Sequence, residues 1–328
     1  MKLAAGIALA LGCLLVRPAA AQAAFSETFL TAPGPIGALK GTLLSPPSKP
    51  TAVVLIIPGS GPTDRDGNNP MGVKASTYRL LAQGLAAKGV ATLRIDKRGM
   101  YASAAAVKDG NAVTIGDYVD DVRAWVKVLA NETHAPCVWV LGHSEGGLVA
   151  LASAGDVPGE CGLVLVSAPG RPMGEILRAQ LKANPANAPL LDQALSAIDA
   201  LEQGHRVDVK DMNPALMRLF HPSVQGYLID AFSYDPAHLV AGVSKPVIVI
   251  QGQRDLQVGE GDARLLKQAN PHASLVLLPD VNHVLKSVTS DDRRANLATY
   301  ADPGLPLAPD VIDAIADFLA KNGTAASK

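Results

Sequence analysis

Apolar residues in this chain gather in short runs, and amphipathic segments separate most of the runs. Six predominantly apolar runs occupy residues 52–57, 90–95, 138–141, 163–166, 247–251 and 274–278. Strands that are buried on both faces of a parallel sheet have this pattern. Apolar residues recur with helical spacing in residues 76–88, 115–130, 148–154, 263–268 and 309–321. The alternation predicts an α/β fold, in which a mostly parallel sheet carries helices on both faces.

Two parts of the chain depart from this alternation. Residues 25–30 and 38–44 flank a Pro33-Gly34-Pro35 turn and predict an antiparallel pair of strands at the start of the sheet. Residues 171–243 contain no strand pattern, but helical patterns occur at 173–183, 190–202 and 214–230. We interpret residues 171–243 as a helical cap inserted into one core that comprises residues 24–170 and 244–328. The cap is either a lid over the functional site or a peripheral helical layer.

The apolar run at residues 138–141 ends in a turn that is typical of a nucleophile. In CVWVLGHSEGG the strand residues 138–141 lead into Gly142-His143-Ser144-Glu145-Gly146, and an alanine-rich helical segment follows. A serine hydroxyl attacks well only when a sharp turn presents it to a base, and the two glycines remove Cβ atoms that would crowd such a turn. Ser144 is therefore the candidate nucleophile of a strand–turn–helix elbow. The alternative is an ordinary serine in a glycine-rich loop.

Two further residues can complete a catalytic triad with Ser144. Asp255 follows the run 247–251, and His283 follows the run 274–278, so both are expected at the carboxyl edge of the sheet, where ligands bind. A histidine with a pKa near ~6.5 can take and return a proton near neutral pH. An aspartate beside it fixes the imidazole tautomer. Asp280, three residues before His283, is the rival acid.

The first 23 residues have the features of an export signal. Lys2 precedes an apolar stretch at residues 3–16, and alanine-rich sequence with an Ala21-Gln22-Ala23 cleavage pattern follows. The stretch is short for a membrane span, which leaves an uncleaved anchor as the alternative. We therefore expect a periplasmic or secreted protein without a stable membrane span after cleavage.

Export bears on the two cysteines of the mature chain. Cys137 and Cys161 each begin an apolar run, CVWVLG and CGLVLVSAP, and a single helix separates the runs. First residues of neighbouring parallel strands lie ~4.8 Å apart, which is close to the Cα separation that a disulfide tolerates. In an oxidising compartment these cysteines form either a disulfide or two buried free thiols.

Charge excludes one class of partner. The formal net charge is −1, and basic residues do not cluster, so nucleic acid is not expected as a partner.

The histidines lack metal-ligand spacing, and no Gly-Lys-Ser/Thr sequence follows the glycine-rich loop at 58–67. The sequence therefore predicts neither a metal nor another cofactor.

Several segments together resemble a known family. The segments LIIPGSGPTDRDGN, RIDKRG and GHSEGG, and the order Ser144, Asp255, His283, resemble α/β-hydrolases of the serine-aminopeptidase-like branch, bacterial carboxylesterases in particular. The resemblance implies an eight-stranded sheet, a helical cap and an oxyanion hole formed by the amides of Ser60 and Glu145. Tyr101 stands where similar proteins often have a second glycine, and it either narrows the cleft or reshapes a loop.

The function expected from these features is hydrolysis of a small-molecule carboxylic ester, with a short to medium acyl chain, through an acyl-Ser144 intermediate. Peptidase or amidase action uses the same triad, and thioesterase action is a further alternative. A non-catalytic binding protein that kept the fold is the hypothesis from a different class. The oligomeric state, the natural substrate and the movement of the cap do not follow from the sequence.

Overall fold

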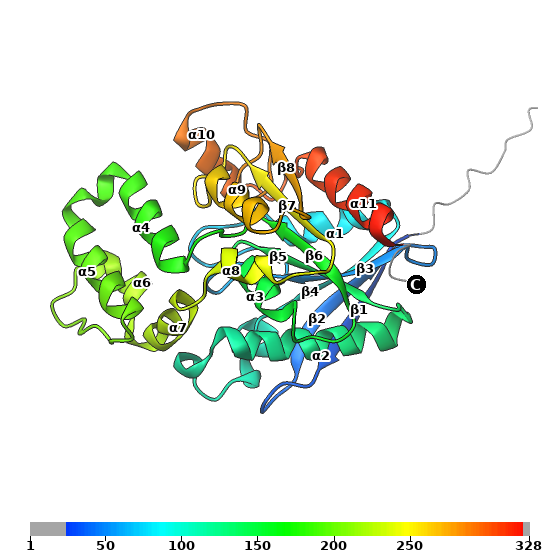
Figure 1. The fold of residues 1–328 in the computed structure, drawn as a ribbon, viewed down its shortest axis with the longest axis horizontal. Helices are drawn as coiled ribbons and strands as arrows, with labels where there is room; N and C mark the ends of the chain where they lie inside the picture. Colours follow the sequence, from blue (N-terminus) through cyan, green and yellow to red (C-terminus); the bar gives the residue numbers. More distant parts are fainter. Residues whose placement is uncertain (1–23, 324–328) are drawn as a thin grey trace, which may run out of the picture.

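The computed structural model describes residues 24–323 and contains the eight-stranded sheet that the family resemblance implies (Figure 1). The strand order is β1-β2-β4-β3-β5-β6-β7-β8, and β2 is antiparallel to both of its neighbours, whereas the other neighbouring pairs are parallel. The strands are β1 Ser26–Ala32, β2 Leu39–Ser45, β3 Ala52–Ile57, β4 Val90–Ile95, β5 Val138–His143, β6 Glu160–Val166, β7 Val247–Gly252 and β8 Ser274–Leu278. The predicted α/β class is confirmed.

Helices cover both faces of the sheet because successive strand residues point to opposite faces. On β3, Ile56 packs in a cluster with Leu81 on one face, whereas Leu55 packs with Trp125 on the other. The core helices are α1 Thr77–Ala87, α2 Ile115–Thr133, α3 Glu145–Ser153, α8 Pro236–Ala241, α9 Glu260–Ala269, α10 Arg293–Ala298 and α11 Pro309–Gly323. Helices α1 and α11 cover the first face, and α2, α3, α8 and α9 cover the second.

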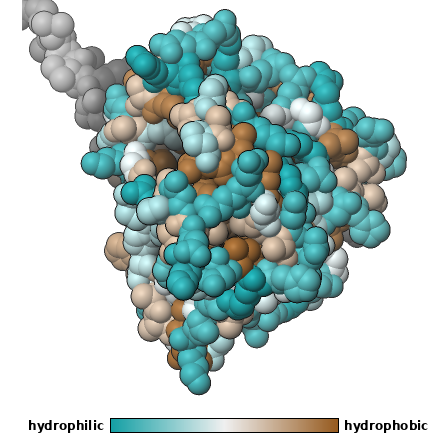
Figure 2. Space-filling model, turned by 90° about the vertical axis from the view of Figure 1, so that its left-hand side faces the viewer, coloured by the Kyte–Doolittle hydropathy of each residue, from teal (hydrophilic) through white to brown (hydrophobic). Residues whose placement is uncertain are grey.

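The segment predicted as a cap is helical and has an apolar cluster of its own. Its helices α4 Met173–Ala183, α5 Leu191–Glu202, α6 Met217–Phe220 and α7 Pro222–Phe232 project to the left of the sheet in Figure 1. Ile198, Leu201 and Phe220 are among the buried residues of this cluster. Helix α8 also lies within residues 171–243, but its Val240 packs in the core cluster, so the end of the predicted cap belongs to the core. Figure 2 looks onto the projecting side and shows apolar surface in a recess surrounded by a hydrophilic rim.

One helix expected in this segment is interrupted. The pattern at 214–230 predicts a continuous helix, but a 3₁₀ turn at Pro214–Leu216, α6 and α7 occupy these residues instead. Pro222 lacks an N–H group to continue a helix from α6, and it stands at the first position of α7, where that group has no intrahelical partner. The apolar periodicity hides this break because both helices contribute to the same cluster.

The chain is cross-linked at the amino edge of the parallel strands. Cys137, which directly precedes β5, forms a disulfide with Cys161 of β6, and the two Cα atoms are 5.2 Å apart. Of the helices within residues 24–323, none has the length and apolarity needed to cross a bilayer. The export signal predicted for residues 1–23 lies outside the described residues.

Candidate active site

Ser144 lies on a sharp turn between β5 and α3. Its φ of 55° and ψ of −127° are unusual for a residue with a side chain, as expected for a nucleophile that a strained turn projects. The flanking glycines permit this turn. A Cβ at Gly142 would lie 2.1 Å from the Gly146 carbonyl oxygen, and a Cβ at Gly146 would lie 2.3 Å from the Ile57 carbonyl oxygen. Neither position can therefore accommodate a side chain without a shift of the backbone.

His283 and Asp255 form a buried pair at the carboxyl edge of the sheet. Asp255 follows β7 and His283 follows β8, and Nδ1 of His283 lies 2.8 Å from Oδ2 of Asp255. The Asp255 carboxylate also accepts hydrogen bonds from the amides of Gln257, at 2.7 Å, and Val258, at 3.0 Å. Burial raises the pKa of Asp255, but the charge and hydrogen bond of His283 and the two amides outweigh it, and the pKa falls below its usual value. This carboxylate is therefore held ionised beside the imidazole.

The rival aspartate is engaged elsewhere. Asp280 lies 3.7 Å from Arg254, and about half of its side chain is exposed, whereas the Asp255 side chain is fully buried. The structure thus brings Asp255, and not Asp280, to His283.

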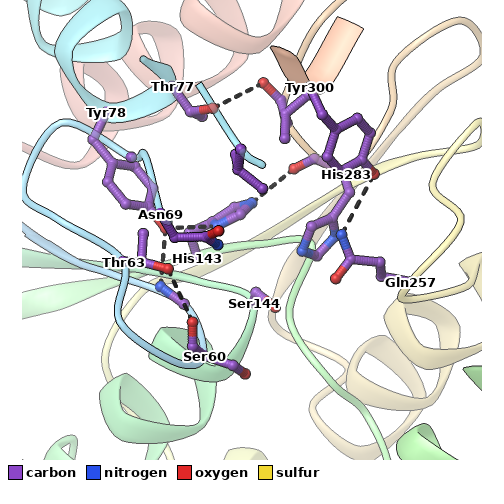
Figure 3. A pocket seen from close by; sticks show the side chains of 14 residues that line it. Ser60, Thr63, Asn69, Thr77, Tyr78, His143, Ser144, Gln257, His283 and Tyr300 are labelled. Atoms are coloured by element: carbon purple, nitrogen blue, oxygen red, sulfur yellow. Dashed lines mark hydrogen bonds between the residues drawn. The ribbon is translucent and has the colours of Figure 1, made fainter. Parts of the chain in front are cut away.

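Ser144 and His283 line one small cavity of about 120 Å³. Figure 3 shows both side chains facing this space, with the loop that follows β3 on the opposite side. Hydroxyl and amide groups contribute much of the lining, which comprises Gly59, Ser60, Thr63, Gly67, Asn69, Val73, Thr77, Tyr78, His143, Ser144, Gln257, His283, Val284 and Tyr300. All of these belong to the α/β core, and none comes from residues 171–243. Tyr101 is not among them, because its hydroxyl donates to the Pro62 carbonyl oxygen at the surface.

The two amides expected to form an oxyanion hole border Ser144. Gly59, which precedes Ser60, lies so close that an added Cβ would be 3.1 Å from the Ser144 Cβ. Within residues 24–323 the Ser60 amide has no protein acceptor. Glu145 is the first residue of α3, where amides have no intrahelical acceptor. Both N–H groups are therefore free to bind an anion.

Ion pairs secure the loop that carries Ser60. Arg65 donates to Asp96 from its amide at 2.9 Å and from its guanidinium at 2.6 Å, and Arg94 pairs with Asp66. The cluster Asp64-Arg65-Asp66 therefore anchors the loop to the end of β4 and does not line the cavity.

A buried hydrogen-bonded chain, which the sequence does not reveal, connects this loop to His283. The Gly59 amide donates to the Tyr78 hydroxyl at 2.9 Å, and this hydroxyl lies 2.9 Å from Nδ1 of His143. Nε2 of His143 lies 2.8 Å from the His283 carbonyl oxygen. A carbonyl only accepts, so Nε2 carries the proton. Burial, together with the charge of His283, lowers the pKa of His143 to about 3, which leaves Nδ1 unprotonated to accept from Tyr78.

Comparison with known proteins places the chain in a family. The model of the family described as serine aminopeptidase S33 matches residues 69–287, more than half of the chain. The chain belongs to this family. Residues 69–287 of this family member include Ser144, Asp255 and His283, whereas Ser60 lies before the matched segment.

Relatives of this family member include a protein named as an esterase and one named as a lipase. Esterase EstD of Thermotoga maritima is 28% identical over 298 residues, which cover 88% of this chain and 65% of EstD. The chain thus spans somewhat less than two thirds of that relative. A monoacylglycerol lipase of Mycolicibacterium smegmatis is 25% identical over 64% of this chain and 76% of the lipase.

Solved structures share the fold at lower identity. The α/β hydrolase GrgF of Penicillium sp. superposes with a TM-score of 0.59 at 16% identity, covering 91% of this chain and 99% of GrgF. An esterase of Pyrococcus furiosus gives a TM-score of 0.56 at 18% identity, covering 90% of this chain and 91% of the esterase. These likenesses establish the α/β-hydrolase fold.

Proposed function

We propose that this protein hydrolyses carboxylic esters through an acyl-enzyme intermediate at Ser144. The observation that carries the proposal is the single cavity shared by Ser144, on its strained turn, and His283, whose Nδ1 binds the buried Asp255. Because Asp255 can only accept when ionised, the neutral imidazole carries its proton on Nδ1, and Nε2 remains a base. His283 takes the Ser144 proton during attack and returns it to the leaving alcohol.

The oxyanion of the tetrahedral intermediate binds the amides of Ser60 and Glu145 in this mechanism. Within residues 24–323 neither amide has a protein acceptor, Glu145 directly follows Ser144, and Gly59, next to Ser60, lies close to the Ser144 side chain, which supports this assignment. Preorganised donors stabilise charge that develops in the transition state without reorganisation of solvent. Water, activated by His283, then resolves the acyl enzyme.

The cavity favours a short acyl chain. A volume of about 120 Å³ with polar groups along its wall accommodates an acetyl or similar group better than a long alkyl chain. An aminopeptidase needs a carboxylate to hold the substrate α-amine, but the described lining contains neither aspartate nor glutamate. Ester hydrolysis is therefore favoured over aminopeptidase action, and two of the relatives are an esterase and a monoacylglycerol lipase by name.

Export of the enzyme and a lid role for residues 171–243 complete the proposal. The disulfide between Cys137 and Cys161 suits an oxidising compartment such as the periplasm. Helices α4 to α7 project from the sheet in Figure 1 and carry an apolar cluster of their own, which supports a lid role, although α7 is anchored to the core, where the Ile115 amide donates to Asp230 at 2.6 Å.

Hydrolysis of p-nitrophenyl esters from acetate to octanoate, beside aminoacyl p-nitroanilides, tests the activity. We expect kcat/KM to be highest for acetate to butyrate and the turnover to vanish in Ser144→Ala. Anilide turnover in preference to ester turnover would make the protein a peptidase. If neither substrate series turned over in a Ser144-dependent way, the esterase proposal would fail and a non-catalytic protein would be favoured.

The two aspartates provide a matched pair for testing the triad. Asp255→Asn should lower kcat by about 10⁴-fold, because the imidazole loses its orienting carboxylate. Asp280→Asn should leave kcat within about twofold, because the Asp280 side chain forms only a partly exposed ion pair with Arg254. Equal losses in both variants would contradict the assignment of Asp255.

A further inference from the structure

Lys97 is a buried cation beside the active site. It follows β4 in the segment RIDKRG, and only 4% of its side chain is exposed. Its Nζ donates to the Gly59 carbonyl oxygen at 2.7 Å and lies 3.3 Å from Oε1 of Glu145. The ammonium also lies 5.6 Å from the centroid of the Tyr118 ring. A charge so buried requires partners of this kind, and the two that bind it through oxygen, Gly59 and Glu145, belong to segments beside Ser144.

The contact with Gly59 acts on the peptide group that contains the Ser60 amide. The Gly59 carbonyl and the Ser60 N–H belong to one planar trans peptide, in which C=O and N–H point in opposite directions. An ammonium that holds the oxygen on one side therefore sets the direction of the N–H on the other. Withdrawal of electron density toward the ammonium also polarises the N–H and makes it a stronger donor.

The contact with Glu145 reaches the second segment. Glu145 begins α3, and its own amide is the other expected donor to the oxyanion. Its carboxylate, 6% exposed, balances the charge of Lys97 and links the start of α3 to the loop after β3. One side chain thus bridges Glu145 and the Gly59–Ser60 peptide, and these carry the two amides that converge on one oxygen in the proposed mechanism.

The loop needs such a constraint because its glycines allow many backbone conformations. Gly59 and Gly61 flank Ser60, and Gly61 has a φ of 66°, a conformation that glycine adopts readily. The peptide before Gly59 is already held, since its amide donates to the Tyr78 hydroxyl at 2.9 Å. Lys97 holds the peptide after Gly59, so the two peptide groups that flank this glycine are both bound.

We propose that Lys97 is a positioning residue of the oxyanion hole, which aims the Ser60 amide and couples it to Glu145. Lys97 does not touch the substrate. The proposal rests on the serine hydrolase function proposed above, and it assigns a role to a residue that the catalytic triad leaves unexplained. Loss of Lys97 leaves both donors present but poorly aimed, which lowers transition-state stabilisation and leaves ground-state binding intact.

The test compares Lys97→Met with a matched pair at the other edge of the sheet. Lys245 lies 3.4 Å from the fully buried carboxylate of Glu160, so Lys245→Met removes a similar lysine–glutamate contact far from Ser144. Lys97→Met leaves the Glu145 carboxylate buried without its partner, and a double variant with Glu145→Gln removes that charge. Two rates are measured for each protein: covalent labelling of Ser144 by a fluorescent fluorophosphonate, and turnover of p-nitrophenyl acetate.

We expect Lys97→Met and the double variant to lose about 10- to 100-fold in both kcat and labelling rate, with KM changed less than about threefold, because one donor is misdirected. Lys245→Met should retain both rates, and the double variant should unfold at a higher temperature than Lys97→Met without recovering rate. A rise in KM alone, recovery of rate in the double variant, or equal losses in Lys245→Met would overturn the proposal.

The labelling rate separates the two proposals. If the unaltered protein is labelled at Ser144 but hydrolyses no ester, the esterase proposal fails, and the labelling rates of the variants still decide the role of Lys97. If the unaltered protein is not labelled at all, both proposals are overturned.

Discussion

Burial governs the protonation of His143, the residue that precedes Ser144. Its pKa of about 3 contrasts with about 6.5 in an unfolded chain, so the folded protein keeps the ring neutral over a range in which the unfolded chain takes up a proton. Stability from this residue is fully present above about pH 6.5 and is lost as the pH falls toward 3. The slope is about 1.4 kcal/mol per pH unit.

Replacement of His143 by glutamine tests this dependence. The free energy of unfolding, measured in urea at pH 7.5 and pH 5.0, should fall by about 2 kcal/mol more in the unaltered protein than in His143→Gln, because only the former has this linked proton. Glutamine can still donate to the His283 carbonyl, which limits other effects. His205→Gln changes an exposed histidine and should follow the unaltered protein. Parallel losses in His143→Gln and the unaltered protein would exclude the linkage.

At the scale of elements, the elbow depends on close packing between β3, β5 and α3. Gly146 lies where a Cβ would be 2.3 Å from the Ile57 carbonyl oxygen, and that oxygen belongs to backbone that cannot rotate away. The helix α3 therefore approaches β3 so closely that only glycine fits at this position. This contact sets the place of Ser144 relative to the loop of Gly59.

Gly146→Ala should therefore destabilise the protein by about 2–4 kcal/mol and abolish most of the proposed esterase activity, since the backbone must shift beside Ser144. Thermal unfolding and kcat/KM measure the two effects. Gly155→Ala is the control, because a Cβ there meets no atom within 4 Å and should change stability by less than about 1 kcal/mol. A fully active and stable Gly146→Ala would contradict the packing argument.

For the whole molecule, the disulfide and Ser144 lie at opposite ends of strand β5. Cys137 directly precedes β5 and Ser144 directly follows it. The disulfide closes a segment of 24 residues and should stabilise the fold by about 3 kcal/mol through restriction of the unfolded chain.

Reduction, or the double substitution Cys137→Ser with Cys161→Ser, should therefore lower the free energy of unfolding by about 3 kcal/mol and leave kcat within about twofold. Urea denaturation with and without dithiothreitol provides the measurement. The double variant should no longer respond to the reductant. A large loss of kcat with intact fold would show that the strand transmits strain to Ser144.

The sequence by itself determined the α/β class and the elements that carry Ser144, Asp255 and His283, because burial on both strand faces leaves a continuous apolar pattern and glycines mark the elbow. These are local signals. Asp255 and Asp280 both follow strands, and only the tertiary structure decided which one reaches His283.

The tertiary structure alone also decided the roles of Tyr78, His143 and Lys97. Tyr78 and His143 are 65 residues apart, and Lys97 is 38 residues from its acceptor Gly59. A hydrogen bond over such separations leaves no periodicity or spacing in the sequence, because strand order and crossover connections set the distance between its ends. The same reason kept the cavity lining out of reach of pattern analysis. The break between α6 and α7 has a local signal, Pro222, which the apolar periodicity hides.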